Sequence, residues 1–184
     1  GIDILCAPGH KGLLGGQGCG FLLMRDGIRL RTLTEGGSGV DSVPEEMPED
    51  PPERYEAGTL STPAIAGLLA GVQYIRQVGL DRISAHLSGW NRRLRERLET
   101  DARVEILTPE TDGAILLFRM AGIPSERIGA ELNRHRICFR AGLHCAPLAH
   151  QTLGTFPDGA VRVSPGIFPR PAEADAFWQV IKDV

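Results

Sequence analysis

Cys6-Ala7-Pro8-Gly9-His10-Lys11-Gly12-Leu13-Leu14-Gly15-Gly16-Gln17-Gly18-Cys19-Gly20 holds a lysine inside a glycine-rich loop, directly after the apolar run Ile2-Asp3-Ile4-Leu5. The apolar run is typical of a buried strand, and the glycines after Lys11 permit positive φ angles and close approach of the backbone to a ligand. A lysine in a tight turn beside His10 can be partly desolvated, which favours the neutral, nucleophilic amine. The segment predicts a Schiff-base lysine, and a glycine-rich turn with an incidental lysine fits the same residues.

Two familiar phosphate-binding loops do not fit this segment. A Walker A loop ends its glycine run in Lys-Ser or Lys-Thr, whereas Gly12 follows Lys11 here. The dinucleotide-binding pattern requires a helix after the glycines, but residues 16–20 lead into Phe21-Leu22-Leu23-Met24, which is typical of a strand. The loop is therefore not predicted to be a nucleotide-binding loop of either kind.

The composition is that of a globular protein with enough chain to bury a core. The 184 residues are 42% hydrophobic and 23% charged, with a net charge of -3 and a pI near 6.0. This charge argues against a nucleic-acid-binding surface, and no apolar run approaches the ~20 residues that span a bilayer. Because the chain begins with Gly1 rather than Met, inside an apolar run, we expect that upstream sequence precedes it.

The cysteines and histidines show neither a disulfide framework nor a metal site. Cys6, Cys19, Cys138 and Cys145 form no CxxC pair, and the histidines have no metal-ligand spacing. This pattern predicts a reducing, cytoplasmic setting. Cys6, Cys19 and Cys138 lie in apolar runs, where a cysteine is expected to act as a small buried hydrophobe.

Periodicity and turn residues predict strands and helices interleaved along the chain. We expect strands at residues 2–5, 20–24, 28–33, 103–107, 113–120, 137–141 and 160–164. A helix with Thr62 as N-cap and Pro63 at its first position is expected to pack on more than one face and to end at Gly79. Further helices are expected at residues 81–99, 125–136, 146–153 and 172–183.

This order of elements predicts an α/β fold, with a small open sheet that carries helices on one face. A domain boundary is expected near Gly79, which gives two domains, residues 1–79 and residues 80–184. Residues 34–53 form a long, acidic, proline-rich connection. Such a connection fits a lid, a binding loop or disorder equally well.

Arg140-Ala141-Gly142-Leu143-His144-Cys145-Ala146-Pro147 places a cysteine between a predicted strand and a short helix. The helix N-terminus offers partial positive charge and His144 a possible proton partner, and both favour the thiolate. Cys145 is therefore a candidate nucleophile. A buried cysteine that only fills space is the alternative.

Gly159-Ala160-Val161-Arg162-Val163-Ser164 places one arginine in an otherwise apolar strand. A guanidinium there requires a partner, and its planar fork suits bidentate capture of a carboxylate. Arg162 is a candidate clamp for an amino-acid carboxylate. A structural ion pair with an Asp or Glu side chain is the alternative.

Together these segments resemble the C-terminal half of a class V, fold type I, pyridoxal-phosphate-dependent enzyme of the cysteine desulfurase and selenocysteine lyase group. The four matching motifs follow in order along nearly the whole chain: Gly9-His10-Lys11-Gly12-Leu13-Leu14-Gly15, Glu56-Ala57-Gly58-Thr59 with Ser61-Thr62-Pro63, the Cys145 loop, and Val161-Arg162-Val163-Ser164. The resemblance implies that residues 1–79 end the large pyridoxal-phosphate-binding domain. Residues 80–184 would form the small C-terminal α+β domain.

The resemblance also implies a role for each matching residue. Lys11 would hold pyridoxal 5'-phosphate covalently and His10 would contact its phosphate. Thr59 would reach the phosphate of the neighbouring subunit's cofactor, so that the active unit is a homodimer. Arg162 would bind the substrate carboxylate. Cys145, with His144 beside it, would attack the substrate sulfur, keep it as a persulfide, and release alanine from cysteine.

Some features depart from the family pattern. Pro8 stands where many relatives have a phosphate-binding serine. The family's phosphate-binding glycine turn, ring-stacking residue and pyridine-pairing aspartate all precede the lysine, so we expect the chain as it stands not to form a working site. A selenocysteine lyase, another class V aminotransferase or lyase, and a non-catalytic dimerisation fragment remain alternatives. A sulfur-acceptor protein would be a further partner, and neither nucleic acid nor membrane is expected to bind.

Overall fold

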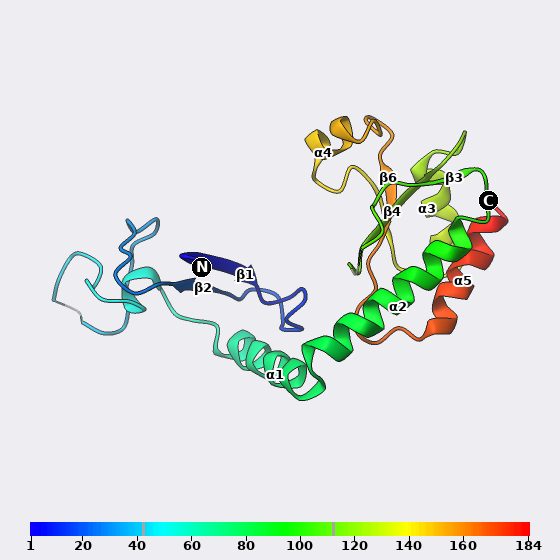
Figure 1. Cartoon of the computed structure of the whole chain (residues 1–184). Helices are drawn as coiled ribbons and strands as arrows, with labels where there is room; N and C mark the ends of the chain where they lie inside the picture. The colour runs from blue at the N-terminus through cyan, green and yellow to red at the C-terminus, as the bar shows by residue number, and fades with distance from the viewer. Residues whose placement is uncertain (42, 112) are drawn as a thin grey trace. The chain divides into compact units, whose positions relative to one another are not determined.

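The computed structural model describes residues 1–41, 43–111 and 113–184. The chain divides into two compact units, Gly1–Gln77 and Val78–Val184, and each is described by itself. Among the described residues no helix combines the length and the apolar character that crossing a bilayer requires. The first unit holds β1, β2, η1 and most of α1, and the second holds the elements from α2 onward (Figure 1).

The first unit is built on a two-stranded antiparallel hairpin. β1 (Ile4–Pro8) pairs with β2 (Gly20–Met24), in a register that runs from Ile4 opposite Met24 to Pro8 opposite Gly20. The Lys11 segment is the loop between these strands. A short 3-10 helix, η1 (Glu53–Tyr55), and the long helix α1 (Thr62–Val78) follow it.

Three expectations for the first unit are wrong. Ile4 and Leu5 of β1 are 39% and 41% exposed rather than buried, because a two-stranded hairpin has no further layer in this unit to cover both faces. Residues 28–33 form no strand, since the hairpin ends at Met24 and the Leu30 amide donates to the hydroxyl of Tyr55 instead. α1 does not pack on several faces, because Ile65 and Leu69 are exposed.

The second unit contains a four-stranded antiparallel sheet with the strand order β3-β4-β6-β5. The predicted strands are all present but shorter than expected: β3 (Val104–Ile106), β4 (Leu116–Met120), β5 (Arg140–Gly142) and β6 (Ala160–Val163). The predicted helices also form, with every end within two residues of its expected position: α2 (Leu80–Leu98), α3 (Ser125–Arg134), α4 (Pro147–Thr152) and α5 (Pro171–Lys182).

One face of this sheet carries the hydrophobic core. Side chains alternate between faces along a strand, so Leu116 and Phe118 of β4 point the same way, and opposite them in the register lie Val163 and Val161 of β6. These side chains pack against buried residues of α2, α3 and α5, and the ring of Phe118 meets that of Phe177 edge-on at 6.2 Å. The expectation of helices on one face is confirmed.

The opposite face of the sheet is more polar. Leu117 of β4 and Arg162 of β6 are register partners on that face, and Glu105 of β3 pairs with Arg119 of β4 at 2.6 Å. α4 contributes no residue to the core cluster and lies apart from α2, α3 and α5 (Figure 1). The sheet thus separates a helix-covered core from the face that carries Arg162.

Candidate active site

The Lys11 loop is closed by its own backbone. The Gly9 amide donates to the Cys19 carbonyl at 2.9 Å, the Gly15 amide donates to the Gly9 carbonyl at 2.8 Å, and the Leu14 amide donates to the Lys11 carbonyl at 3.0 Å. Leu14 adopts a φ of 60°, so the turn uses the left-handed region even at a residue with a large side chain. The hairpin and these bonds fix the backbone from which Lys11 projects.

Helix α1 holds the loop through close backbone contacts. A Cβ atom on Gly71 would overlap the carbonyl oxygen of Leu13, and a Cβ atom on Gly15 would lie 3.0 Å from the Cα atom of Leu68. Only glycine allows the helix and the loop to approach this closely. The side chain of Lys11 itself is exposed, so this unit does not desolvate its amine as the tight turn suggests it would.

Thr59 lies at the edge of a hollow in the first unit. The hollow has a volume of about 980 Å³, and its lining includes Thr59, Leu60 and the glycine run at residues 36–39. The Gly58 amide donates to the Gly37 carbonyl at 2.9 Å and so ties the two segments together. Thr59 is exposed, which leaves its hydroxyl available to a ligand.

The Cys145 loop connects β5 to α4 and has an unusual backbone. His144 and Cys145 have φ angles of 54° and 57°, so two consecutive residues other than glycine occupy the left-handed region. That conformation costs about 1–2 kcal/mol for each such residue. The Ala146 amide closes the turn by donating to the Leu143 carbonyl at 2.8 Å, and Cys145 is exposed.

Arg162 neighbours this loop through the pairing of β5 with β6. Arg140 of β5 lies opposite Arg162, and Gly142, at the start of the loop, lies opposite Ala160. The Nε atom of Arg162 is buried and has no hydrogen-bond partner in the described part of the chain. Among those residues no carboxylate lies within ion-pair distance of Arg162 either. The ion-pair alternative for Arg162 is therefore wrong for this unit.

His144 is engaged at both ring nitrogens. Its Nδ1 atom lies 3.0 Å from Nε2 of His150, and its Nε2 atom lies 3.3 Å from the Arg140 carbonyl oxygen. Burial lowers the pKa of His144, and the positive charges of Arg162 and Arg140 lower it further against the opposing effect of the Arg140 carbonyl. Both guanidinium groups therefore oppose a positive charge on the His144 ring.

Sequence reasoning missed His150 and Thr155. His150 Nδ1 lies 2.7 Å from the Thr155 hydroxyl, and both residues are buried, with 3% of each exposed. His150 is six residues from His144, a separation at which neither a regular helix nor a regular strand brings two side chains into contact. The left-handed turn at His144 and Cys145 brings the two rings together, and no feature of the sequence predicts that turn.

The structure places the predicted residues in two groups. His10, Lys11 and Thr59 belong to Gly1–Gln77, and His144, Cys145 and Arg162 belong to Val78–Val184. All four cysteines are free thiols, and Cys6 and Cys138 are exposed rather than buried as expected. Within the described ranges no cluster of His, Cys, Asp and Glu could hold a metal ion.

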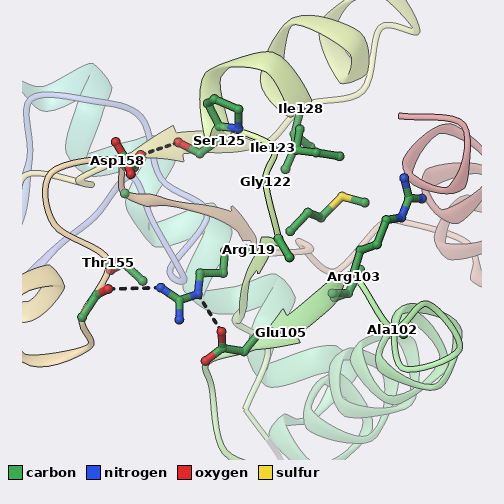
Figure 2. Close-up of a pocket in the computed structure, with 16 residues that line it drawn as sticks. Ala102, Arg103, Glu105, Arg119, Gly122, Ile123, Ser125, Ile128, Thr155 and Asp158 are labelled. Carbon is green, nitrogen blue, oxygen red and sulfur yellow. Dashed lines mark hydrogen bonds and ion pairs between the residues drawn. The ribbon is translucent and has the colours of Figure 1, made fainter.

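A further pocket in the second unit contains none of the predicted residues. It has a volume of about 540 Å³ and lies beside the β3–β4 edge of the sheet. Figure 2 shows Arg119 at its wall, where the guanidinium pairs with Glu105 and donates to the Gly154 carbonyl at 3.1 Å, and Ser125, whose hydroxyl donates to the Asp158 carbonyl at 2.7 Å. These polar groups satisfy one another, which makes the pocket a poor candidate for the site.

Comparison with solved structures confirms the predicted fold class. The apo structure of a cysteine desulfurase from Thermococcus onnurineus NA1 matches 98% of this chain and 46% of its own, with a TM-score of 0.82 and 29% identity. The crystal structure of the cysteine desulfurase CsdA from Escherichia coli matches 99% of this chain and 46% of its own, with a TM-score of 0.90. At 22% identity, that second match speaks for the fold alone.

Sequence comparison gives the same kind of relative. A protein named "Probable cysteine desulfurase" from Methanothermobacter thermautotrophicus is 30% identical over all of this chain and 48% of its own length. Another with that name, from Halobacterium salinarum, is 31% identical over 98% of this chain and 44% of its own length. The chain thus spans about half the length of the curated relatives it matches. The sequence model of the class-V aminotransferases matches residues 1–177, and the chain belongs to the class-V aminotransferase family.

Proposed function

We propose that this chain is part of a cysteine desulfurase that converts L-cysteine to L-alanine and collects the sulfur on Cys145. Enzymes of this family depend on pyridoxal 5'-phosphate. The observation that carries the proposal is Arg162, whose buried Nε atom has no partner among the described residues and which lies next to the loop of an exposed cysteine. A buried guanidinium nitrogen without a hydrogen-bond partner is costly, so the arrangement favours an anion that arrives from outside.

The residues of the first unit fit a phosphate-bearing aldehyde cofactor. Lys11 presents an exposed amine on a loop that its own backbone bonds close, and such an amine can bind a carbonyl carbon covalently. His10 precedes it, and Thr59 offers an exposed hydroxyl, so both could donate to a phosphate. When bound, the cofactor supplies an electron sink that weakens bonds at the substrate's α- and β-carbons.

The residues of the second unit fit the substrate and the sulfur-transfer step. Arg162 would bind the carboxylate of L-cysteine and orient its side chain toward the loop. The Cys145 thiolate would attack the substrate sulfur, so that a sulfur–sulfur bond forms as the carbon–sulfur bond breaks. The carbon skeleton would take up a proton and leave as L-alanine, and Cys145 would keep the persulfide for an acceptor.

Other proposals follow from the resemblance and from the names of the relatives. We propose a homodimer in which Thr59 serves the neighbouring subunit's cofactor, a sulfur-acceptor protein as partner, and a cytoplasmic location, for which the four free thiols speak. Selenocysteine is the alternative substrate, because selenium could leave the same carbon. An aminotransferase on this scaffold would have no use for Cys145.

Replacement of Cys145 in the full-length protein tests the proposal. We expect Cys145→Ala to reduce sulfide release from L-cysteine to background while the visible absorption of the bound cofactor persists. Cys138→Ala, which removes another exposed thiol of the same unit, is the matched control and should leave turnover unchanged. Lys11→Ala should abolish the absorption itself. If Cys145→Ala retains sulfide and alanine release, the desulfurase assignment is lost.

A further inference from the structure

We propose that His150 is a positioning residue that, through His144, holds the Cys145 loop in its left-handed conformation. This inference rests on the proposed function, because it assigns a task to residues behind the proposed nucleophile. The observation behind it is a continuous chain of polar contacts from the buried Thr155 hydroxyl through His150 and His144 to the Arg140 carbonyl. Among the described residues, no other hydrogen bond involves a side chain of residues 143–146.

The inner end of this chain is firmly anchored. The Thr155 amide donates to the His150 carbonyl at 2.9 Å, and the Gly159 amide donates to the Thr155 carbonyl at 2.6 Å. Arg119, from the middle of the sheet, donates to the carbonyl of Gly154, the residue before Thr155. His150 is therefore fixed by buried structure, and it transmits that fixed position outward to His144.

One arrangement of protons satisfies every link with both rings neutral. The Thr155 hydroxyl donates to His150 Nδ1 at 2.7 Å, His150 Nε2–H donates to His144 Nδ1 at 3.0 Å, and His144 Nε2–H donates to the Arg140 carbonyl at 3.3 Å. No donor or acceptor of either ring is left over. The neutral pair thus closes the loop without an external partner.

The same atoms can also accept one extra proton. His144 then donates from both nitrogens, His150 donates from Nδ1 to the Thr155 oxygen, and the Thr155 hydroxyl turns to the His150 carbonyl, 3.3 Å away. A second extra proton would place two N–H groups face to face across the 3.0 Å gap and break the link. Burial and the charges of Arg162, His150 and Arg140 oppose protonation of His144, which favours the neutral pair.

Hydrogen exchange in the full-length protein measures how well the backbone amides of the Cys145 loop are protected. In His150→Phe, which keeps a buried ring but removes both nitrogens, we expect the amides of residues 143–146 to exchange roughly fivefold faster or more, since each lost hydrogen bond is worth about that factor. His150→Gln, which retains an N–H near the position of Nε2, should restore much of the protection. His135→Phe, an exposed histidine on the same unit, is the matched control and should change nothing.

Thr155→Val keeps the test decisive if His150→Phe does not fold. It removes the hydroxyl that holds His150 Nδ1 at the inner end of the chain of contacts, so the amides of residues 143–146 should again exchange faster than in the wild type. Equal exchange of these amides in the wild type and in His150→Phe or Thr155→Val overturns the proposal.

Kinetics separate this inference from the proposed function. A residue that only positions the nucleophile should lower kcat for L-cysteine in His150→Phe and leave KM nearly unchanged, because Arg162 still binds the substrate. If Cys145→Ala retains activity, the desulfurase assignment fails. The exchange experiment then still decides the role of His150, because it measures the backbone and not turnover.

Discussion

Arg162 is the arginine of the second unit whose buried Nε atom has no hydrogen-bond partner among the described residues. Arg93, Arg103 and Arg119 each pair with an acidic side chain, whereas the described residues give Arg162 none. A planar guanidinium held against a sheet can donate parallel hydrogen bonds to both oxygens of one carboxylate, a geometry that an ammonium does not match. At this position the chemistry of the residue and the absence of an internal partner point to the same role.

Substitution of Arg162 should therefore affect substrate binding strongly. We expect Arg162→Gln in the full-length protein to lose about 2–4 kcal/mol of substrate binding, roughly 30- to 1,000-fold in kcat/KM for L-cysteine. Arg162→Lys should recover only part of this loss. Steady-state kinetics provide the measurement, and Arg134→Gln, on the exposed side of α3, is the control. Equal kcat/KM in Arg162→Gln and the wild type would remove the carboxylate clamp from the proposal.

The candidate site residues that stand out in the sequence are those whose side-chain type is unusual for its surroundings. Lys11 among glycines, Cys145 in a polar loop and Arg162 in an apolar strand all stand out on that ground. His150 and Thr155 do not, since their task depends on a turn with two consecutive left-handed residues. Hydrogen bonds across such a turn follow no regular spacing in the sequence, so only the structure reveals them.

Helix α1 offers a direct test of how the Lys11 loop is held. A Cβ atom on Gly71 would meet the Leu13 carbonyl, whereas one on Gly67 would lie 3.7 Å from its nearest neighbour, the Gly16 nitrogen. In a helix Gly→Ala gains about 0.5–1 kcal/mol, but overpacking costs about 1–3 kcal/mol. We expect Gly67→Ala to be stabilising, and Gly71→Ala to be destabilising and to weaken cofactor loading. Chemical unfolding and the cofactor absorption measure both effects, and equal behaviour of the two variants would contradict the close contact.

The pairing of α2 with α5 has a charged component that depends on pH. A hydrogen bond from Arg93 lowers the pKa of Asp175 below its ordinary value of 3.8, and Arg97 adds to the effect. Because the pKa of the folded state lies below that of the unfolded state, the stabilisation is complete above pH 3.8 and is lost as the pH falls through the folded value.

We therefore expect Asp175→Asn to unfold at a lower urea concentration than the wild type at pH 7. The difference between the two midpoints should shrink as the pH is lowered below about 4, where the wild-type carboxyl becomes protonated. Asp183→Asn, at the C-cap of α5, serves as a control outside this ion pair. A difference that stays constant from pH 7 to pH 3 would show that the ion pair is not its source.

The elements that could be predicted from the sequence are those with a long apolar periodicity, such as helices that pack in the core. The helices at residues 81–99 and 172–183 have a sustained apolar stripe, and that stripe lies in the core. Residues 28–33 alternate apolar and basic side chains as a strand would, but alternation supplies no neighbour with which to pair. A strand forms only where a partner strand pairs with it, and the sequence does not show that partner. The strands of the second unit are therefore shorter than expected, and the strand expected at residues 28–33 does not form.

At the scale of the whole chain, the two units differ in how they are stabilised. In Gly1–Gln77 the described residues that count as buried are two glycines, Gly9 and Gly71, whereas the second unit buries a cluster of large apolar side chains around Phe118. Burial of apolar surface is the main favourable contribution to folding. The second unit therefore contains most of what can stabilise this chain.

Limited proteolysis of the 184-residue chain should reveal this difference. We expect a protease to degrade the first unit quickly and to leave a resistant product of about residues 78–184, because cleavage requires local unfolding and the second unit has the core that opposes it. Mass spectrometry of the digest identifies the product. Phe118→Ala, which should cost about 3–5 kcal/mol, ought to make that product susceptible as well. Equal resistance of both units would contradict this account of their stability.

The two outer strands of the second unit's sheet are both very short. β3 and β5 have three residues each, with the charged Glu105 at the middle of one and Arg140 at the start of the other. Short, charged borders are poor templates for a foreign strand, so they discourage fibril growth by edge addition. The proposed desulfurase would gain from this, because its exposed Cys145 follows β5 and other chains that meet the protein there would find no strand edge on which to aggregate.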